Sequence, residues 1–233
     1  EISADWGAQR VKGLSILAIL KDIVRKKKGK TDKRTETSLI EEFYYPKFGP
    51  GQLWETAARE FEKMGGRIEK GCKVVRILTE GAEVKGVVFE RNGKEETLEG
   101  DLVISSMPLK DLVEGMADAP EEIRAIAAGL PYRDFVTVGL LVKKLNLKNE
   151  TQLKTLSNIV PDCWIYVQDT GVKLGRIQIF NNWSPYLVQN PEETVWIGLE
   201  YFCREGDSYW NMSEEDWVAL GTDELVKMGV ISS

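Results

Sequence analysis

The chain has 233 residues, 42% of them hydrophobic, and 31 Lys and Arg against 37 Asp and Glu give a formal net charge of −6. This length accommodates one large domain or two small ones. The acidic balance argues against a nucleic-acid partner, which usually requires a basic surface. The longest apolar stretch, Leu14 to Val24, is interrupted by Ser15, Lys21 and Asp22. It falls short of the roughly 18 residues that a transmembrane segment needs, so we predict none.

Two residue counts restrict the chemistry further. The absence of histidine excludes Ser-His-Asp and Cys-His catalysis and most zinc sites, so we predict no metal. Carboxylates, Lys, Tyr or a cofactor must carry any reaction. The three cysteines, Cys72, Cys163 and Cys203, are too few and too far apart for a disulfide framework. We predict unpaired thiols and a reducing, cytoplasmic location.

Apolar residues at three-to-four spacing predict an amphipathic first helix from Ala8 to Val24. The segment 25–34 that follows carries seven basic residues and one acid, Asp32. It fits a solvated loop, or alternatively a contact with a polyanion or a membrane surface. The chain begins with Glu1 instead of Met, which suggests an excised fragment.

Turn residues from Tyr44 to Gly51 lead into a second helix, with apolar positions from Leu53 to Met64 and an end at Gly65 and Gly66. Period-two and apolar patterns then predict strands, with a hairpin turn at Asn92-Gly93. These strands are 67–69, 73–78, 83–90, 95–98 and 101–105. The uniformly apolar run 102–104 predicts a strand that is buried on both faces.

The second half of the chain predicts two short helices, a further set of strands and a final helix. The helices at 108–116 and 120–128 each begin at a proline. The strands are 134–142, 163–168, 176–180 and 195–202. The last helix, 213–228, opens with the capping-box spacing of Ser213 and Asp216.

This order of elements predicts an α/β (α+β) fold with two lobes, in which mixed sheets have flanking helices. We assign a helical segment with the basic loop to 1–45, a first lobe to 46–115, a β-rich lobe to 116–210 and the C-terminal helix to 211–233.

Two short motifs could approach a ligand. Gly49-Pro50-Gly51 before a helix could offer backbone N–H groups to a phosphate, although Trp54 stands where a dinucleotide fingerprint has its third glycine. A plain turn is the alternative. Ser105-Ser106-Met107-Pro108 follows the apolar strand, where small hydroxyl residues and free amides can contact a ligand or simply cap a turn.

A richer cluster of aromatic, amide and guanidinium side chains lies between residues 164 and 183. Alternation along a strand puts Arg176 and Gln178 on one face. Aromatic faces beside such groups suit a sugar or a phosphorylated ligand, held by stacking and forked hydrogen bonds. The alternatives are core packing for the tryptophans and a surface ion pair for Arg176. The cluster comprises Trp164, Tyr166, Arg176, Gln178, Asn182 and Trp183, with Tyr132 and Arg133 upstream.

Read in order, these segments resemble the flavin-containing amine oxidase and protoporphyrinogen oxidase superfamily, and within it the branch of NAD(P)/FAD-dependent oxidoreductases similar to UDP-galactopyranose mutase. The resemblance covers nearly the whole chain. The segments that carry it are 3–13, 42–51 (EFYYPKFGPG), 103–109 (VISSMPL), 132–135 (YRDF), 164–166 (WIY), 175–178 (GRIQ), 182–185 (NWSP) and 198–202 (GLEYF).

The resemblance implies an internal part of a larger FAD-dependent enzyme, because the family's N-terminal GxGxxG unit and its C-terminal flavin segment are not in this sequence. It places Val74 and Val75 beside the adenine. The turn that holds Ser105, Ser106 and Pro108 lies near the cofactor by the same analogy. These residues by themselves are not expected to retain FAD.

The resemblance also implies a substrate pocket for a phosphorylated or glycosylated small molecule. Arg176 is similar to the arginine that mutase relatives place on the substrate diphosphate, and Tyr132-Arg133 is similar to the pair bordering their pocket. Trp164, Tyr166, Gln178, Asn182 and Trp183 complete the expected pocket. No catalytic acid or base is identified. The alternative is a carbohydrate- or nucleotide-sugar-binding module without catalysis.

Overall fold

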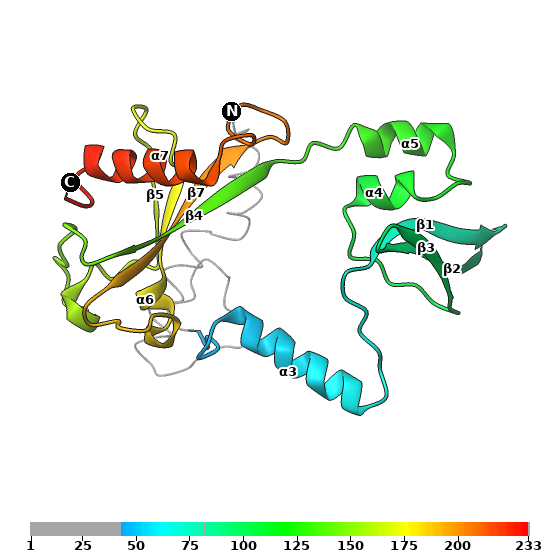
Figure 1. Cartoon of the computed structure of the whole chain (residues 1–233), viewed down its shortest axis with the longest axis horizontal. Coiled ribbons are helices and arrows are strands. Elements are labelled where there is room, and N and C mark those ends of the chain that lie inside the picture. The colour runs from blue at the N-terminus through cyan, green and yellow to red at the C-terminus, as the bar shows by residue number, and fades with distance from the viewer. Residues whose placement is uncertain (1–42, 82, 233) are drawn as a thin grey trace, which may run out of the picture. The chain divides into compact units, whose positions relative to one another are not determined.

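The computed structural model describes residues 43–81 and 83–232. Two compact units divide the chain, Glu1–Tyr45 and Pro46–Ser233. The helix predicted over 8–24 and the basic segment 25–34 lie outside the described residues. The second unit contains helices α3 to α7 and two sheets, which confirms the α/β (α+β) fold class (Figure 1). Over the described residues, no helix has the length and apolar character needed to cross a membrane.

Helix α3 (Pro50–Lys63) confirms the second predicted helix. Pro50 occupies its first turn, where the missing N–H costs nothing, and Gly49 precedes it with a φ of 84° that favours glycine. The Phe48 N–H donates to Gln52 Oε1 at 3.0 Å, which ties down the entry. Ser184 Oγ donates to the carbonyl of Lys47 at 2.7 Å, so the segment before α3 is fixed to residue 184.

The first sheet is an antiparallel meander of β1 (Lys73–Glu80), β2 (Glu83–Arg91) and β3 (Lys94–Glu99). The predicted turn at Asn92-Gly93 is confirmed, with φ values of 51° and 72° that give the left-handed backbone of a tight hairpin. Ile77, Val88 and Phe89 are buried, Val88 and Phe89 on opposite faces of β2, whereas β3 is exposed throughout.

Two predicted strands were wrong. Residues 67–69 and 101–105 form no strand, and Leu102 and Ile104 are 78% and 89% exposed. Apolar composition favours a buried strand, but a strand exists only where a neighbour accepts its backbone hydrogen bonds. No described segment pairs with residues 101–105.

Helices α4 (Leu109–Glu114) and α5 (Glu121–Ala128) confirm the two proline-started helices. The Arg124 side chain holds the connection between them by donating to the carbonyls of Met116, Ala117 and Ala119. The Ile77 N–H of β1 donates to the carbonyl of Gly115 at 2.9 Å, which joins this helix pair to the first sheet.

The second sheet has the order β4-β7-β6-β5, with every neighbouring pair antiparallel. Its strands are β4 (Asp134–Val142), β5 (Trp164–Tyr166), β6 (Arg176–Ile179) and β7 (Val195–Cys203). All four strands were predicted. Strand β6 ends one residue early because Phe180 begins the short helix α6 (Phe180–Trp183). Short 3-10 turns lie at Leu156–Asn158 and Pro185–Leu187.

Helix α7 (Glu214–Lys227) covers one face of this sheet (Figure 1). Ser213 caps it by accepting from the N–H of Asp216 at 3.1 Å, as the predicted capping box requires. Trp217 and Leu225 pack with the inward side chains of the sheet, and the Tyr201 and Trp217 rings lie 4.9 Å apart. This layer is the hydrophobic core of the described chain. The further core side chains are Val138, Ile159, Leu174, Ile177, Ile179, Val195, Ile197, Leu199 and Val230.

Candidate functional site

The face of the second sheet opposite α7 gathers most of the predicted substrate residues, and we call it the open face. Alternation along each strand turns its side chains away from the α7 core. The strands supply Phe135, Thr137, Gly139 and Leu141 from β4, Trp164 and Tyr166 from β5, Arg176 and Gln178 from β6, and Trp196, Gly198, Glu200 and Phe202 from β7.

A polar trio lies at the centre of the open face. Glu200 is directly opposite Arg176 in the pairing of β6 with β7. Its Oε2 accepts hydrogen bonds from Nε of Arg176, at 2.7 Å, and from Nη2. Its Oε1 accepts from Nε2 of Gln178 at 2.5 Å. Glu200 is 2% exposed, so the predicted ion pair of Arg176 exists with a buried carboxylate instead of a surface one.

The Glu200 carboxylate dominates the electrostatics of Arg176. Hydrogen bonding to it raises the pKa of the Arg176 guanidinium, while partial burial opposes that shift. Hydrogen bonding to the Tyr166 side chain raises this pKa further. The Tyr166 ring centroid also lies 5.6 Å from the Arg176 Cζ. Arg176 is therefore a fixed cation that keeps 28% of its side-chain surface exposed.

Aromatic rings frame the polar trio. Trp164 and Trp183 pack with centroids 5.1 Å apart, and Phe180 and Trp196 lie 6.4 Å apart. Glycines make room for two of these rings, since a Cβ at Gly198 would come 3.0 Å from Phe180 and one at Gly139 would come 3.0 Å from Trp196. The open face thus combines flat apolar surfaces with central donors and acceptors, which can hold a ring by stacking and orient its polar groups.

The remaining predicted substrate residues divide into two groups. The Arg133 guanidinium lies 5.8 Å from the Phe202 ring, at the end of the open face where β4 begins, and Tyr132 beside it is exposed. Asn182 instead donates its amide hydrogens to the carbonyls of Val160 and Asp162, at 2.7 and 2.8 Å. Its amide nitrogen therefore holds the 160–162 loop.

Three of the five predicted cofactor residues line one cavity of about 590 Å³. Val74, Val75 and Pro108 lie there with Met107, Asp111 and Glu114, and the wall also includes Cys72, Lys73 and Gly115. Ser105 Oγ instead accepts from the N–H of Met107 at 3.2 Å, which makes a capping turn, and Ser106 is exposed. Apolar side chains beside carboxylates suit a purine with hydroxyl groups, and Lys73 is the one basic residue of this lining.

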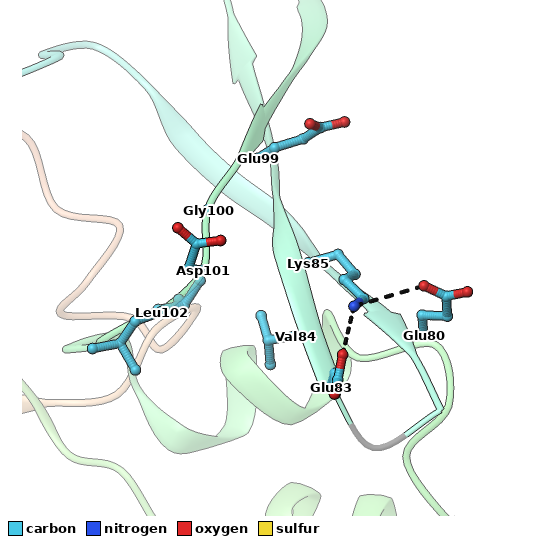
Figure 2. Close-up of a pocket in the computed structure, with 9 residues that line it drawn as sticks. Glu80, Glu83, Val84, Lys85, Glu99, Gly100, Asp101 and Leu102 are labelled. Carbon is cyan, nitrogen blue, oxygen red and sulfur yellow. Dashed lines mark hydrogen bonds and ion pairs between the residues drawn. The ribbon is translucent and has the colours of Figure 1, made fainter.

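A second cavity, of about 860 Å³, is acidic. Lys85 Nζ lies 2.5 Å from a Glu83 carboxylate oxygen and 3.7 Å from one of Glu80. Figure 2 shows both ion pairs, with Asp101 on the neighbouring segment. Its negative charge disfavours a phosphorylated ligand. No group of His, Cys, Asp and Glu residues in the described part of the chain could hold a metal ion.

Sequence reasoning missed Glu200 as a site residue, although the sequence carries a signal for it. Glu200 is the one charged residue of β7, whose other residues are apolar or glycine. A carboxylate in such a strand must find partners, because an unpaired buried charge is strongly unfavourable. Identifying its two partners on β6 requires the register between β6 and β7. Only the structure gives that register.

All three cysteines are free, as predicted. Burial raises the pKa of the Cys163 thiol, and nearby Asp162 adds to this shift. Burial likewise raises the pKa of the Cys203 thiol, assisted by the charge of Asp207. Both thiols are consequently poor nucleophiles.

Comparison with known proteins shows the fold. No protein-family model matches the sequence, and no curated protein is significantly similar to it. Among solved structures, a reduced UDP-galactopyranose mutase matches with a TM-score of 0.62 and 18% identity over 80% of this chain. An oxidoreductase from Methanosarcina mazei matches with a TM-score of 0.51 and 13% identity over 78% of the chain.

A third structure, from an Exiguobacterium species and provisionally assigned as a protoporphyrinogen oxidase, matches with a TM-score of 0.54 and 13% identity over 77% of the chain. The chain spans 37%, 39% and 35% of the lengths of these three proteins, in the order given. It therefore shares the fold of a part of oxidoreductases and of UDP-galactopyranose mutase, as the resemblance in sequence led us to expect.

Proposed function

We propose that the chain is the central part of an FAD-dependent oxidoreductase or mutase-like enzyme, and that the open face is its substrate wall. The observation that carries the proposal is the Arg176-Glu200-Gln178 trio, framed by aromatic rings on a sheet whose other face is closed by α7. The fold shared with oxidoreductases and UDP-galactopyranose mutase supports it.

The residues of the open face suit a phosphorylated or glycosylated small molecule. Arg176 can donate to a phosphate oxygen with the N–H groups that Glu200 does not take. Trp164 and Tyr166 are exposed beside it and offer flat surfaces on which a sugar or base can stack. Arg133 supplies a second cation at the end of the face.

FAD, when bound, would supply the electron, hydride or nucleophilic chemistry, which explains how a chain without histidine can serve an enzyme. Val74, Val75 and Pro108 would contact its adenine end, and Ser105 and Ser106 lie on the adjoining turn. Since these residues include no pyrophosphate cradle, we expect this chain alone to bind FAD weakly. We further propose a cytoplasmic enzyme with no nucleic-acid partner.

Two measurements test the proposal. The product of the complete gene should show the visible absorption bands of flavin, and these should bleach when a reductant is added. In calorimetry with UDP-galactose as the probe, Arg176→Lys should weaken binding by about one decade, because a point charge cannot replace the fork. A colourless gene product together with unchanged affinity in Arg176→Lys would overturn the proposal.

A non-catalytic binding module for carbohydrates or nucleotide sugars is the second candidate. One observation favours it: residues 132–203, all of them described, supply the whole open face. A sugar could therefore bind without any flavin. A gene product that binds UDP-galactose and carries no flavin would select this candidate over the enzyme.

A further inference from the structure

We propose that Glu200 is a positioning residue that fixes which hydrogen-bonding groups Arg176 and Gln178 present to a ligand. The inference rests on the proposed function of the open face. It assigns to the ligand an anionic acceptor that lies next to a donor such as a hydroxyl, the arrangement found in a sugar phosphate or a nucleotide sugar.

The first step concerns the guanidinium of Arg176. Glu200 Oε2 accepts from Nε and from Nη2, which lie along one edge of the planar group. A guanidinium carries five N–H donors, so three remain, and they belong to Nη1 and Nη2 at its outer end. Because Glu200 is buried in the inner strand β7, this edge is anchored, while 28% of the Arg176 side chain stays exposed.

The second step concerns the amide of Gln178. An ionised carboxylate can only accept hydrogen bonds, so the neighbouring amide must turn its NH₂ group toward Glu200 Oε1. The Gln178 carbonyl oxygen is then directed away from Glu200 and is an acceptor. A donor end at Arg176 and an acceptor at Gln178 lie on the same face of one strand.

The third step concerns the energetic effect of this anchoring. An arginine that is already held loses less side-chain freedom when a ligand binds, and preorganised donors therefore bind more tightly. The Arg176-Glu200 pair is also neutral as a whole. The open face thus selects a ligand by the placement of donor and acceptor more than by total charge.

Calorimetric titration of the 233-residue chain with UDP-galactose and with UDP tests the inference. Glu200→Gln can both donate and accept, which frees the Gln178 amide to turn over and leaves Arg176 without its charged anchor. We expect it to weaken UDP-galactose binding by about tenfold and to reduce the preference for UDP-galactose over UDP. Glu200→Asp keeps the charge and should fall between Glu200→Gln and the wild type, which secures the test if Glu200→Gln folds poorly.

Glu224→Gln is the matched control, because Glu224 is also buried but lies on α7, on the other side of the sheet. It should leave both affinities unchanged. In a double-mutant cycle, Glu200→Gln and Arg176→Lys should be non-additive, since the first acts through the second.

The outcomes distinguish the positioning role of Glu200 from the proposed function of the open face as a substrate wall. If wild type binds UDP-galactose, Arg176→Lys weakens it, and Glu200→Gln behaves as Glu224→Gln does, the positioning role is refuted and the substrate wall stands. If the wild type binds neither probe, or Arg176→Lys leaves binding unchanged, the substrate wall fails and the positioning role fails with it.

Discussion

The two sheets of the described chain differ in how completely they bury their apolar side chains. The second sheet and α7 form a closed layer in which Ile179, Ile197 and Leu199 have no exposed surface. The first sheet and, separately, helix α3 leave large apolar groups exposed, among them Ile104 after β3 and Trp54 on α3. Stability therefore depends mainly on the second sheet, and that rigid layer also carries the open face.

The largest expected effect comes from truncating the same residue type in the two regions. Ile197→Ala removes a fully buried side chain and should lower the free energy of unfolding by about 2–5 kcal/mol. Ile104→Ala, at 89% exposure, should change it by less than about 0.5 kcal/mol. Urea denaturation followed by circular dichroism measures both. Equal losses of unfolding free energy in the two variants would mean that the second sheet does not contribute more to stability than the first.

A buried carboxylate should give the next largest effect. Glu224 accepts from the backbone N–H groups of Lys173 and Leu174, at 2.5 and 3.0 Å, and so fixes the loop before β6 to α7. Glu224→Ala leaves these donors without a partner and should cost about 1–3 kcal/mol. Its exposed neighbour Asp223 is the control. A cost for Asp223→Ala as large as that for Glu224→Ala would refute this role.

Alkaline pH should weaken the second sheet specifically. Burial raises the pKa of Tyr201, and the charge of Glu224 raises it further. The unfolded chain loses the Tyr201 hydroxyl proton near pH 10, while the folded chain keeps it. The contribution of Tyr201 to the free energy of unfolding is therefore complete below about pH 10 and is lost as the pH rises above it. Above that pH, Tyr201 should lower the free energy of unfolding by about 1.4 kcal/mol per pH unit.

Tyr201→Phe isolates that contribution. The variant should lack this part of the alkaline loss of unfolding free energy, and it keeps the buried ring that packs against Trp217. Denaturation curves recorded from pH 7 to pH 11 compare the two proteins. Identical slopes above pH 10 would contradict the assignment.

The smallest effect is expected at an ion pair of the first sheet. Arg76 on β1 and Glu95 on β3 lie 2.6 Å apart across the intervening strand β2, and both side chains are about half exposed, at 50% and 52%. A double-mutant cycle with alanine should give a coupling of about 0.2–1 kcal/mol that fades in high salt. A coupling of several kcal/mol that persists in salt would show that this sheet is less solvated than described.

Local patterns were sufficient to predict most of the secondary structure. The helix α3, the turn at Asn92-Gly93 and the cap at Ser213 were all readable because each depends on neighbouring residues, although α3 begins at Pro50, inside the segment predicted as a turn. The run 101–105 was misread because a strand depends on a distant partner that its own sequence does not specify.

The candidate site was likewise predictable only where local patterns determine it. Alternation placed Arg176 and Gln178 on one face, which the structure bears out. The position of Glu200 opposite Arg176 depends on the register between β6 and β7, a long-range property that strand patterns do not encode. Asn182 shows the converse, since an amide that looked suited to a ligand holds backbone carbonyls instead.

Ligand mapping by nuclear magnetic resonance tests the central claim, that the open face binds substrate, most directly. Titrating the labelled chain with UDP-galactose should shift the indole N–H of Trp164, the side-chain amide of Gln178 and the backbone N–H groups near Glu200. The N–H groups of α7 should not move. Shifts confined to the acidic cavity around Lys85, or to α7, would contradict the claim.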